Sequence, residues 1–246
     1  MDPLIARRLL EINRRFYTAF GTEFSATRQR LQPGVMRILD GLRGDESILD
    51  LGCGNGGLAR ALAGRGFSGA YLGLDFSLPL LAEAGALRER FLFAEADLTG
   101  RWEDVKSEKE EAKPLLFPSH FSLITSFATL HHIPSMELRL NLLAKAHSLL
   151  TPAGTFVHSE WQFLNSPKLR ARIQPWSDAG LSDADVDPND YLLDWRAGGR
   201  GLRYVHHFDE AELEALAAAS KFHVRQTFRS DGNNGQLGLY QVWEKL

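Results

Sequence analysis

The amino-acid sequence predicts a doubly wound α/β fold, with a seven-stranded, mostly parallel sheet that ends in an antiparallel C-terminal hairpin. Three observations lead to this prediction. Short apolar runs alternate with stretches of helical periodicity, which is typical of a parallel sheet with helices on both faces. A glycine-rich turn follows the first apolar run. The last two runs are separated by residues 229–235, too short for a crossover helix, so these two strands should be antiparallel.

The predicted strands are short apolar runs bounded by turn residues. They comprise residues 47–51, 70–74, 91–94, 121–126, 155–159, 221–228 and 236–243. The predicted helices carry apolar residues three and four positions apart. They comprise residues 4–20, 33–42, 57–63, 78–88, 137–150 and 210–219. Gly21 is expected to end the first helix, Pro33 lies in the first turn of the second, and residues 151–154 should form a turn.

Two stretches interrupt the alternation of strands and helices. Residues 102–113 are highly charged, which favours a solvated surface loop or helix. Residues 160–207 show little periodicity, and a segment of this length in a compact domain is usually a lid, a binding loop or poorly ordered. We therefore expect a single domain over residues 1–246, with a helical cap at 1–45 and a lid-like insertion at 160–207.

Composition restricts the class of protein. The chain has 246 residues, a formal net charge of −3 and one cysteine, Cys53. This charge gives no global basic field for nucleic acid, although local basic clusters are compatible with RNA binding. A single cysteine forms neither an internal disulfide nor a cysteine-rich zinc site, so a reducing compartment, the cytoplasm, is expected. The charged N-terminus lacks the apolar core of a signal peptide, and we expect no membrane span.

The strongest local signal is the glycine-rich sequence at residues 49–57, between a predicted strand and a predicted helix. Gly52, Gly54 and Gly57 fit G-x-G-x-x-G, and Asp75 ends the next strand, as the dinucleotide fingerprint also requires. Glycines let a ligand approach the backbone, and the helix N-terminus adds unpaired N–H donors. The pattern predicts a nucleoside cofactor with its ribose on Asp75, and it leaves the kind of cofactor open.

Three features favour a sulfonium nucleoside over a nicotinamide dinucleotide. Two predicted helices precede the first strand, whereas a dinucleotide domain usually begins with the strand. Asp50 lies at the end of that strand, and a carboxylate that points into the site suits a cationic amino-acid moiety and repels a pyrophosphate. The terminal hairpin also differs from the second half of a dinucleotide fold.

The sequence LDLGCGNGGLA at residues 49–59 resembles the first motif of class I S-adenosylmethionine-dependent methyltransferases, and the order of elements resembles theirs. The resemblance implies a Rossmann-like methyltransferase with S-adenosyl-L-methionine as cofactor. It implies that the glycine loop wraps the methionine part, that Asp75 holds the ribose and that Asp97 borders the adenine. The implied cofactor-binding residues are Asp50, Gly52, Cys53, Gly54, Asn55, Gly56, Asp75, Phe76, Ser77, Asp97, Leu98, Phe127 and Ala128, the last two near the methyl group.

A narrower resemblance is to the tRNA wobble-uridine carboxymethyl methyltransferases, which esterify the carboxylate of a 5-carboxymethyl group on the wobble uridine. It is carried by residues 13–17, 23–28, 130–133, 174–176 and 203–208. It implies that Tyr17, Phe24 and Arg28 close over the cofactor, and that Arg203 and His206 face the RNA or the substrate carboxylate. It also implies two partners, tRNA and, as in eukaryotic members, a small zinc-binding activator subunit.

The residues themselves leave the methyl acceptor open. A carboxylate is ionised at pH 7 and needs only donors to orient it, whereas a phenol or an amine would use a base such as His131 or His132. No metal site is predicted, because no cysteine or carboxylate cluster accompanies these histidines and the H-x-E sequence at 158–160 lacks the cysteine partners of a zinc deaminase. Three functions remain: an RNA methyltransferase, a small-molecule O- or N-methyltransferase, and a non-catalytic cofactor-binding subunit.

Overall fold

The computed structural model describes residues 1–27, 30–84, 87, 91–100, 102 and 120–246. Arg28, residues 103–113 of the charged stretch and part of the predicted helix at 78–88 lie outside these residues. What the sequence predicts for them stays a prediction.

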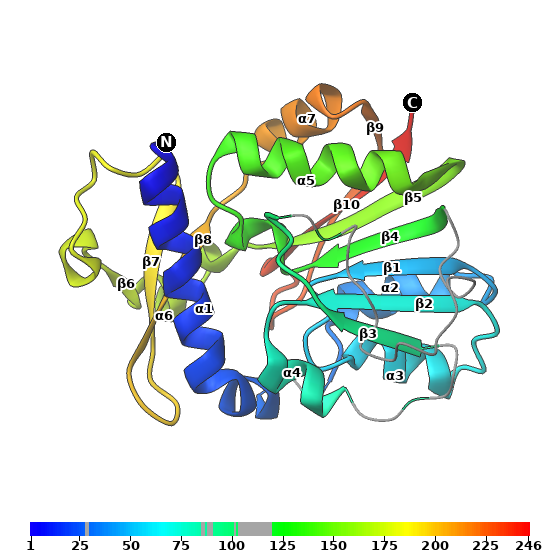
Figure 1. Ribbon diagram of the computed structural model, residues 1–246, viewed down its shortest axis with the longest axis horizontal. Coiled ribbons are helices and arrows are strands. Elements are labelled where there is room, and N and C mark those ends of the chain that lie inside the picture. Colours follow the sequence, from blue (N-terminus) through cyan, green and yellow to red (C-terminus); the bar gives the residue numbers. More distant parts are fainter. Residues whose placement is uncertain (28–29, 85–86, 88–90, 101, 103–119) are drawn as a thin grey trace.

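Seven strands form one sheet in the order β3-β2-β1-β4-β5-β10-β9 (Figure 1). The strands are β1 (Ser47–Leu51), β2 (Ala70–Asp75), β3 (Phe91–Glu95), β4 (Phe121–Phe127), β5 (Leu150–Trp161), β9 (Phe222–Ser230) and β10 (Gly238–Lys245). The first five are parallel, and β10 lies antiparallel between β5 and β9. The arrangement confirms the predicted fold class, including the antiparallel hairpin.

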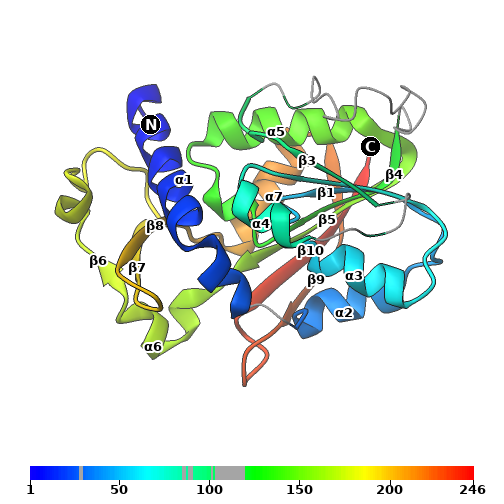
Figure 2. The ribbon, with the colours of Figure 1, turned by 60° about the horizontal axis from the view of Figure 1, so that its bottom comes forward.

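Helices cover both faces of this sheet (Figures 1 and 2). The helices are α1 (Pro3–Ala26), α2 (Pro33–Asp40), α3 (Gly57–Gly64), α4 (Leu78–Glu83), α5 (Met136–Leu149), α6 (Pro167–Arg170) and α7 (Glu210–Ala219). Leu49 of β1 packs in an apolar cluster with α5 and α7, whereas its neighbour Ile48 packs in a second cluster with α2 and α3. Side chains therefore alternate between the two faces along β1, as they do in any strand.

The strand order reverses between β1 and β4, where the crossovers begin to run in the opposite direction. In open α/β sheets, ligands bind beyond the carboxyl ends of the strands at such a reversal. Helix α1 crosses in front of this edge, between the main sheet and a smaller one (Figure 1). It packs against α4 through Phe16, Tyr17 and Leu80. The fold thus encloses the edge where a ligand is expected.

The insertion at residues 160–207 contains a three-stranded antiparallel sheet. Its strands are β6 (Ile173–Gln174), β7 (Asp190–Trp195) and β8 (Gly201–His206), accompanied by the short 3-10 helices η3 (Phe163–Asn165) and η4 (Trp176–Ala179). Leu9 of α1 packs in one apolar cluster with Leu192 and Tyr204. The segment is therefore well ordered, and its strands, which the sequence did not predict, are held by pairing with each other and by α1.

Two predicted boundaries were wrong. Helix α1 continues through Gly21 to Ala26. A Cβ at Gly21 would lie 3.3 Å from the Cβ of Pro79, so the glycine allows a close approach to α4. The turn predicted at residues 151–154 belongs instead to β5, whose register with β4 shifts between Phe121 and Leu123. The chain therefore passes from α5 into the sheet without a separate turn.

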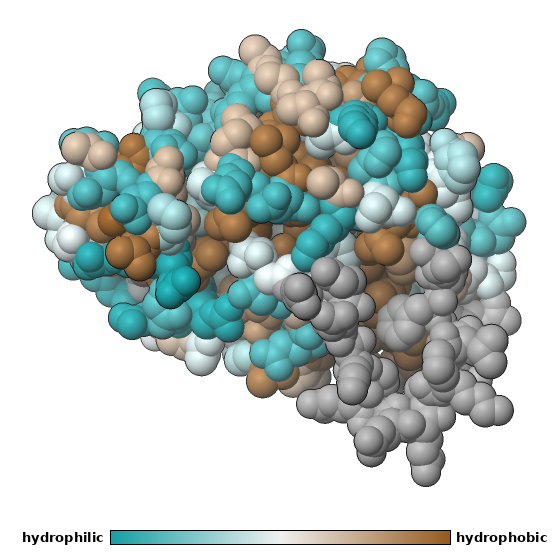
Figure 3. Space-filling model, turned by 45° about the horizontal axis from the view of Figure 1, so that its top comes forward, coloured by the Kyte–Doolittle hydropathy of each residue, from teal (hydrophilic) through white to brown (hydrophobic). Residues whose placement is uncertain are grey.

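Hydrophilic and apolar side chains are mixed over the face drawn in Figure 3. Among the residues that the structure describes, the exposed large apolar side chains come from different elements: Leu4, Met36, Leu78, Met136 and Leu246. They do not gather on one element. Within the described residues, no helix is both long and apolar enough to cross a membrane.

Candidate active site

A cavity of about 410 Å³ lies at the carboxyl ends of β1, β2, β4 and β5. Helix α1, strand β8 and the 3-10 helix η2 (Leu130–His132) are joined by hydrogen bonds and form a second wall. The predicted site residues on its surface are Tyr17, Phe24, Gly52, Gly54, Asp75, Phe76, Asp97, Leu98, Phe127, Ala128, His131, His132 and Arg203. The cavity thus brings together residues that are far apart in the sequence.

The glycine loop contributes backbone to the cavity. Gly52 and Gly54 have φ values of 76° and 54°, which favour glycine. A Cβ at Gly52 would lie 2.1 Å from Oγ1 of Thr129, whereas no described atom lies within 4 Å of a Cβ built at Gly54. Since Gly54 also lines the cavity, the space beside it is available to a ligand. The loop therefore fits a nucleoside cofactor that lies against the backbone.

Asp75 lies at the end of β2 with both carboxylate oxygens already oriented. Oδ2 accepts a hydrogen bond from the Gly54 N–H at 2.9 Å, and Oδ1 accepts one from the Ser77 N–H at 2.8 Å. Burial raises the pKa of Asp75 to about 6. Each carboxylate oxygen keeps accepting capacity for a ligand, as the predicted bonds to ribose hydroxyls require.

Asp97 and Leu98 line the cavity beyond β3, at its predicted adenine end. The Asp97 carboxylate accepts from the Thr99 N–H at 2.9 Å and pairs with Arg14 at 3.0 Å, which ties it to α1. Phe127 and Ala128 line the cavity at the end of β4, where the Ala128 N–H bonds to Ser159. The positions of these four residues are compatible with the roles that the resemblance implies.

The prediction that the Asp50 carboxylate points into the site was wrong. Asp50 does not line the cavity and accepts hydrogen bonds from the Tyr71 hydroxyl at 2.5 Å and the Thr125 hydroxyl at 2.7 Å. The side-chain alternation of β1 explains this, because Asp50 shares the face of Ile48. Burial raises the pKa of Asp50 to about 6. Its contacts make it a structural link between three strands.

Four other predicted cofactor residues also lie off the cavity surface: Cys53, Asn55, Gly56 and Ser77. The buried Cys53 thiol packs against Gly73, and burial raises its pKa. Asn55 donates to the Ser25 hydroxyl at 2.7 Å, and Gly56, with φ 74°, precedes the first residue of α3. Cys53, Asn55 and Gly56 shape the loop and connect it to α1, whereas Ser77 precedes the first residue of α4.

Tyr17 and His132 join α1 to the wall formed by η2. His132 Nδ1 lies 3.0 Å from the Tyr204 carbonyl, which can only accept, so this nitrogen carries the proton. Burial lowers the pKa of His132 to about 3, so the ring is neutral and Nε2 accepts from the Tyr17 hydroxyl at 3.0 Å. The polar groups of both side chains are thereby committed to holding the wall.

Arg203 places a buried positive charge on the cavity wall, with only 4% of the residue exposed. Its guanidinium lies over the rings of Phe16, Phe24, Trp161 and Trp195, at 5.0 to 5.6 Å from their centroids. Such rings stabilise a cation through their negative faces. The cavity therefore holds a guanidinium that can orient an anionic group.

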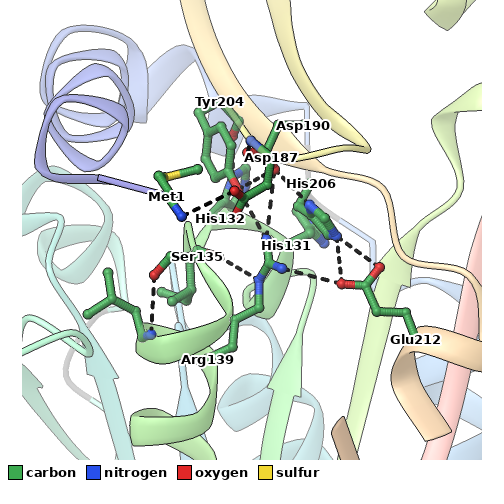
Figure 4. Close-up of polar contacts among 12 residues, drawn as sticks. Met1, His131, His132, Ser135, Arg139, Asp187, Asp190, Tyr204, His206 and Glu212 are labelled. Atoms are coloured by element: carbon green, nitrogen blue, oxygen red, sulfur yellow. Dashed lines mark hydrogen bonds and ion pairs between the residues drawn. The ribbon is translucent and has the colours of Figure 1, made fainter. Parts of the chain in front are cut away.

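His206 does not line the cavity, so the prediction that it faces the substrate was wrong. Figure 4 shows its ring between Asp190 and Glu212, with Nδ1 2.7 Å from the first carboxylate and Nε2 2.9 Å from the second. Arg203 and His206 are an odd number of residues apart on β8, so their side chains point to opposite faces. His206 shares its face with Tyr204, whose hydroxyl also bonds to Asp190 at 2.8 Å.

His131 and His132 both line the cavity. His131 Nδ1 lies 3.0 Å from Glu160 Oε2, and burial together with nearby positive charges lowers the pKa of this histidine. The sequence analysis did not predict Glu160 as a site residue. Its only signal was the H-x-E pattern at 158–160, which was set aside because the cysteine ligands of a zinc deaminase are absent from the sequence. Within the described residues, no group of three or more metal-ligating side chains occurs.

The family described as methyltransferase domain matches residues 24–227. The chain belongs to this methyltransferase family. It is an S-adenosyl-L-methionine-dependent methyltransferase, as the family and the class I fold together require. In this methyltransferase, the open space at Gly54 and the oriented carboxylate of Asp75 fit the cofactor. No curated protein matches the sequence.

Solved methyltransferase structures share the fold at low sequence identity. A SAM-dependent methyltransferase from Methanosarcina mazei is 20% identical, with a TM-score of 0.61 over 88% of this chain and 98% of that one. The 1,6-didemethyltoxoflavin-N1-methyltransferase of Burkholderia thailandensis is 18% identical, with a TM-score of 0.58 over 94% and 89%. An amino pentose methyltransferase from Micromonospora echinaspora is 16% identical, with a TM-score of 0.58 over 93% and 97%.

Proposed function

We propose that this methyltransferase esterifies a carboxylate, and that its substrate is the 5-carboxymethyl group of a wobble uridine in tRNA. One observation carries the proposal. Three of the sequence segments that resemble the wobble-uridine methyltransferases, at residues 13–17, 130–133 and 203–208, each contribute side chains to one cavity wall. Tyr17, His131 and Arg203 are the respective examples. Because the matching segments form one wall of the cavity, we infer that this chain binds the same methyl acceptor as the wobble-uridine methyltransferases.

The residues of the wall suit an anionic acceptor. The cofactor supplies an activated methyl group on a sulfonium, so the chain has to hold and orient the acceptor. A carboxylate is ionised at pH 7 and needs no general base. The Arg203 guanidinium can hold it by charge-assisted hydrogen bonds. Phe24 and Trp161, which also line the cavity, offer aromatic faces to an unstacked base.

The test is incubation of the protein with cofactor labelled in the methyl group and with total tRNA, followed by mild alkali. A methyl ester on tRNA releases its label as volatile methanol, whereas a methyl group on nitrogen or in an ether stays on the RNA. We expect alkali-labile label on tRNA. Absence of label on tRNA, with or without a small zinc-binding activator subunit, would reject tRNA as the substrate.

The alternative is a small-molecule O- or N-methyltransferase, and the contact between His131 and Glu160 is the observation that favours it. A neutral histidine on the wall can take a proton from a phenol or an amine. Incubation with extracted metabolites instead of tRNA tests it, with alkali-stable label as the expected product. The cavity is open between the two walls, which argues against a non-catalytic subunit.

A further inference from the structure

Glu160 is a buried carboxylate between two histidines, and it belongs to the lining of the cavity beside His131. Only 1% of the residue is exposed. Oε2 accepts from the backbone N–H of His131 at 3.1 Å and lies 3.0 Å from Nδ1 of the same residue. Oε1 lies 2.9 Å from Nδ1 of His158. All of these partners are buried, so the contacts are shielded from solvent.

The backbone contact to Oε2 favours the tautomer of His131 that carries its proton on Nδ1. A backbone N–H can only donate, so Oε2 accepts from it, and this favours Oε1, which faces His158, as the site of any proton on Glu160. Even when Glu160 is protonated, the proton can reside on Oε1 and donate to His158. With the proton absent or on Oε1, Oε2 accepts from Nδ1–H of His131. The Trp161 N–H also approaches this nitrogen, but at 3.4 Å its contact is weaker than the one to the carboxylate.

With the proton on Nδ1, the lone pair of the neutral His131 ring is on Nε2. Nε2 makes no hydrogen bond to any described residue, and the ring lines the cavity. Arg203, on the same wall, contributes only donors. The wall thus combines a cation with a hydrogen-bond acceptor.

We propose that Glu160 is a positioning residue that fixes His131 with its Nε2 lone pair toward the cavity, so that the enzyme selects a methyl acceptor that carries an N–H or O–H donor beside its anionic group. The inference rests on the proposed function in one respect, that this wall binds the acceptor. It adds a requirement on the acceptor that the guanidinium alone does not impose.

The first test reads the tautomer of His131 directly and needs no acceptor. Long-range proton–nitrogen NMR of the uniformly labelled protein separates the two tautomers, and the His131 signals are those missing in His131→Gln. We expect the proton on Nδ1 in the wild type and in Glu160→Gln, whose amide oxygen can replace Oε2. We expect a loss of this preference in Glu160→Leu. A wild-type proton on Nε2 overturns the proposal, even if Glu160→Leu does not fold.

The second test measures the kinetics of the same variants with whichever acceptor gains label. For Glu160→Leu we expect the KM for the acceptor to rise about tenfold, the loss of one hydrogen bond, with unchanged cofactor affinity by calorimetry. Glu160→Gln should stay within about threefold of the wild type, because its carbonyl keeps the acceptor at Oε2. The control is Glu212→Gln, which changes a carboxylate bonded to a histidine outside the cavity and should leave the KM unchanged.

The two proposals can fail separately. If tRNA gains no label while the His131 proton lies on Nδ1 and depends on Glu160, the substrate proposal fails and the positioning role stands. If Glu160→Leu binds the acceptor as the wild type does, the positioning role fails whatever the acceptor is.

Discussion

The Tyr17 hydroxyl donates a hydrogen bond to Nε2 of His132, 3.0 Å away, and so connects the long first helix to the loop that follows β4. The other ring nitrogen donates to the Tyr204 carbonyl, which lies on β8. One histidine therefore joins the helical cap, the main sheet and the small sheet at the cavity.

Tyr17→Phe removes this hydrogen bond and retains the ring. We expect the free energy of unfolding to fall by about 1 kcal/mol, the usual contribution of one such bond. We expect cofactor affinity to fall as well, because the wall loses the group that fixes it. Urea unfolding and calorimetry measure the two effects. An unchanged unfolding midpoint would mean that the contact contributes nothing to stability.

Cofactor affinity should depend on pH through Asp75. Its pKa is raised to about 6, and ribose hydroxyls prefer the ionised carboxylate, so affinity should decrease as the pH falls below that value. The expected loss is about tenfold between pH 7 and pH 5. Asp75→Asn should bind weakly at both values, with little difference between them. Calorimetry at the two pH values checks this, and an equal pH effect in the variant would remove Asp75 as its source.

Asp50 should make the protein less stable as the pH rises, whereas a salt-bridged carboxylate makes a protein more stable as the pH rises. The folded pKa of Asp50 is about 6 against an ordinary value of 3.8, so the folded state binds the proton more tightly. The contribution of Asp50 to stability is therefore largest below about pH 4 and declines by about 3 kcal/mol as the pH rises through 6. Urea unfolding from pH 4 to pH 7 should show a smaller decline in Asp50→Asn than in the wild type.

Two glycine substitutions should separate cofactor binding from folding. Gly54→Ala places a methyl group in the cavity, so cofactor affinity should fall sharply while the unfolding free energy drops by about 1–2 kcal/mol from the positive φ. In Gly69→Ala the new Cβ would lie 2.0 Å from the Glu46 carbonyl, so the loss of stability should be larger. Gly69 does not line the cavity. A soluble, folded Gly54→Ala protein with wild-type affinity would contradict the placement of the cofactor.

Arg203 and His206 make a matched pair, since both were predicted from one sequence segment and only Arg203 lines the cavity. Arg203→Met keeps an apolar stem among the aromatic rings and removes the charge. Methyl transfer should fall at least about tenfold, the loss of one charge-assisted hydrogen bond, with cofactor affinity nearly unchanged. His206→Gln should lower stability and leave the KM for the acceptor unchanged. A higher KM in His206→Gln together with normal methyl transfer in Arg203→Met would instead place His206 in the acceptor site.

The sequence was most informative where the contacts are local. The glycine loop and Asp75 are recognisable because a turn, a helix start and the tip of the next strand meet wherever this fold occurs. The sequence analysis assigned the side chains of Asp50 and His206 to the wrong face of their strands, although the alternation of side chains along each strand determines the face. The strands β6, β7 and β8 were missed for a different reason: their packing on α1 is long-range, and no periodicity within residues 160–207 indicates them.

Glu160 shows the same limit at the level of a single side chain. Its position next to His131 depends on the pairing of β4 with β5 and on the loop that follows β4, which no spacing in the sequence encodes. Sequence reasoning could nominate the histidine because of its place after a strand, but not the carboxylate that orients it.

The position of β10 has a consequence for synthesis of the chain. This strand is the last to leave the ribosome among those of the main sheet, yet it lies inside it, between β5 and β9. Until it emerges, β5 has one unpaired edge, and exposed edges of this kind recruit other strands. The nascent protein therefore exposes this edge from the synthesis of β5 until β10 pairs with it.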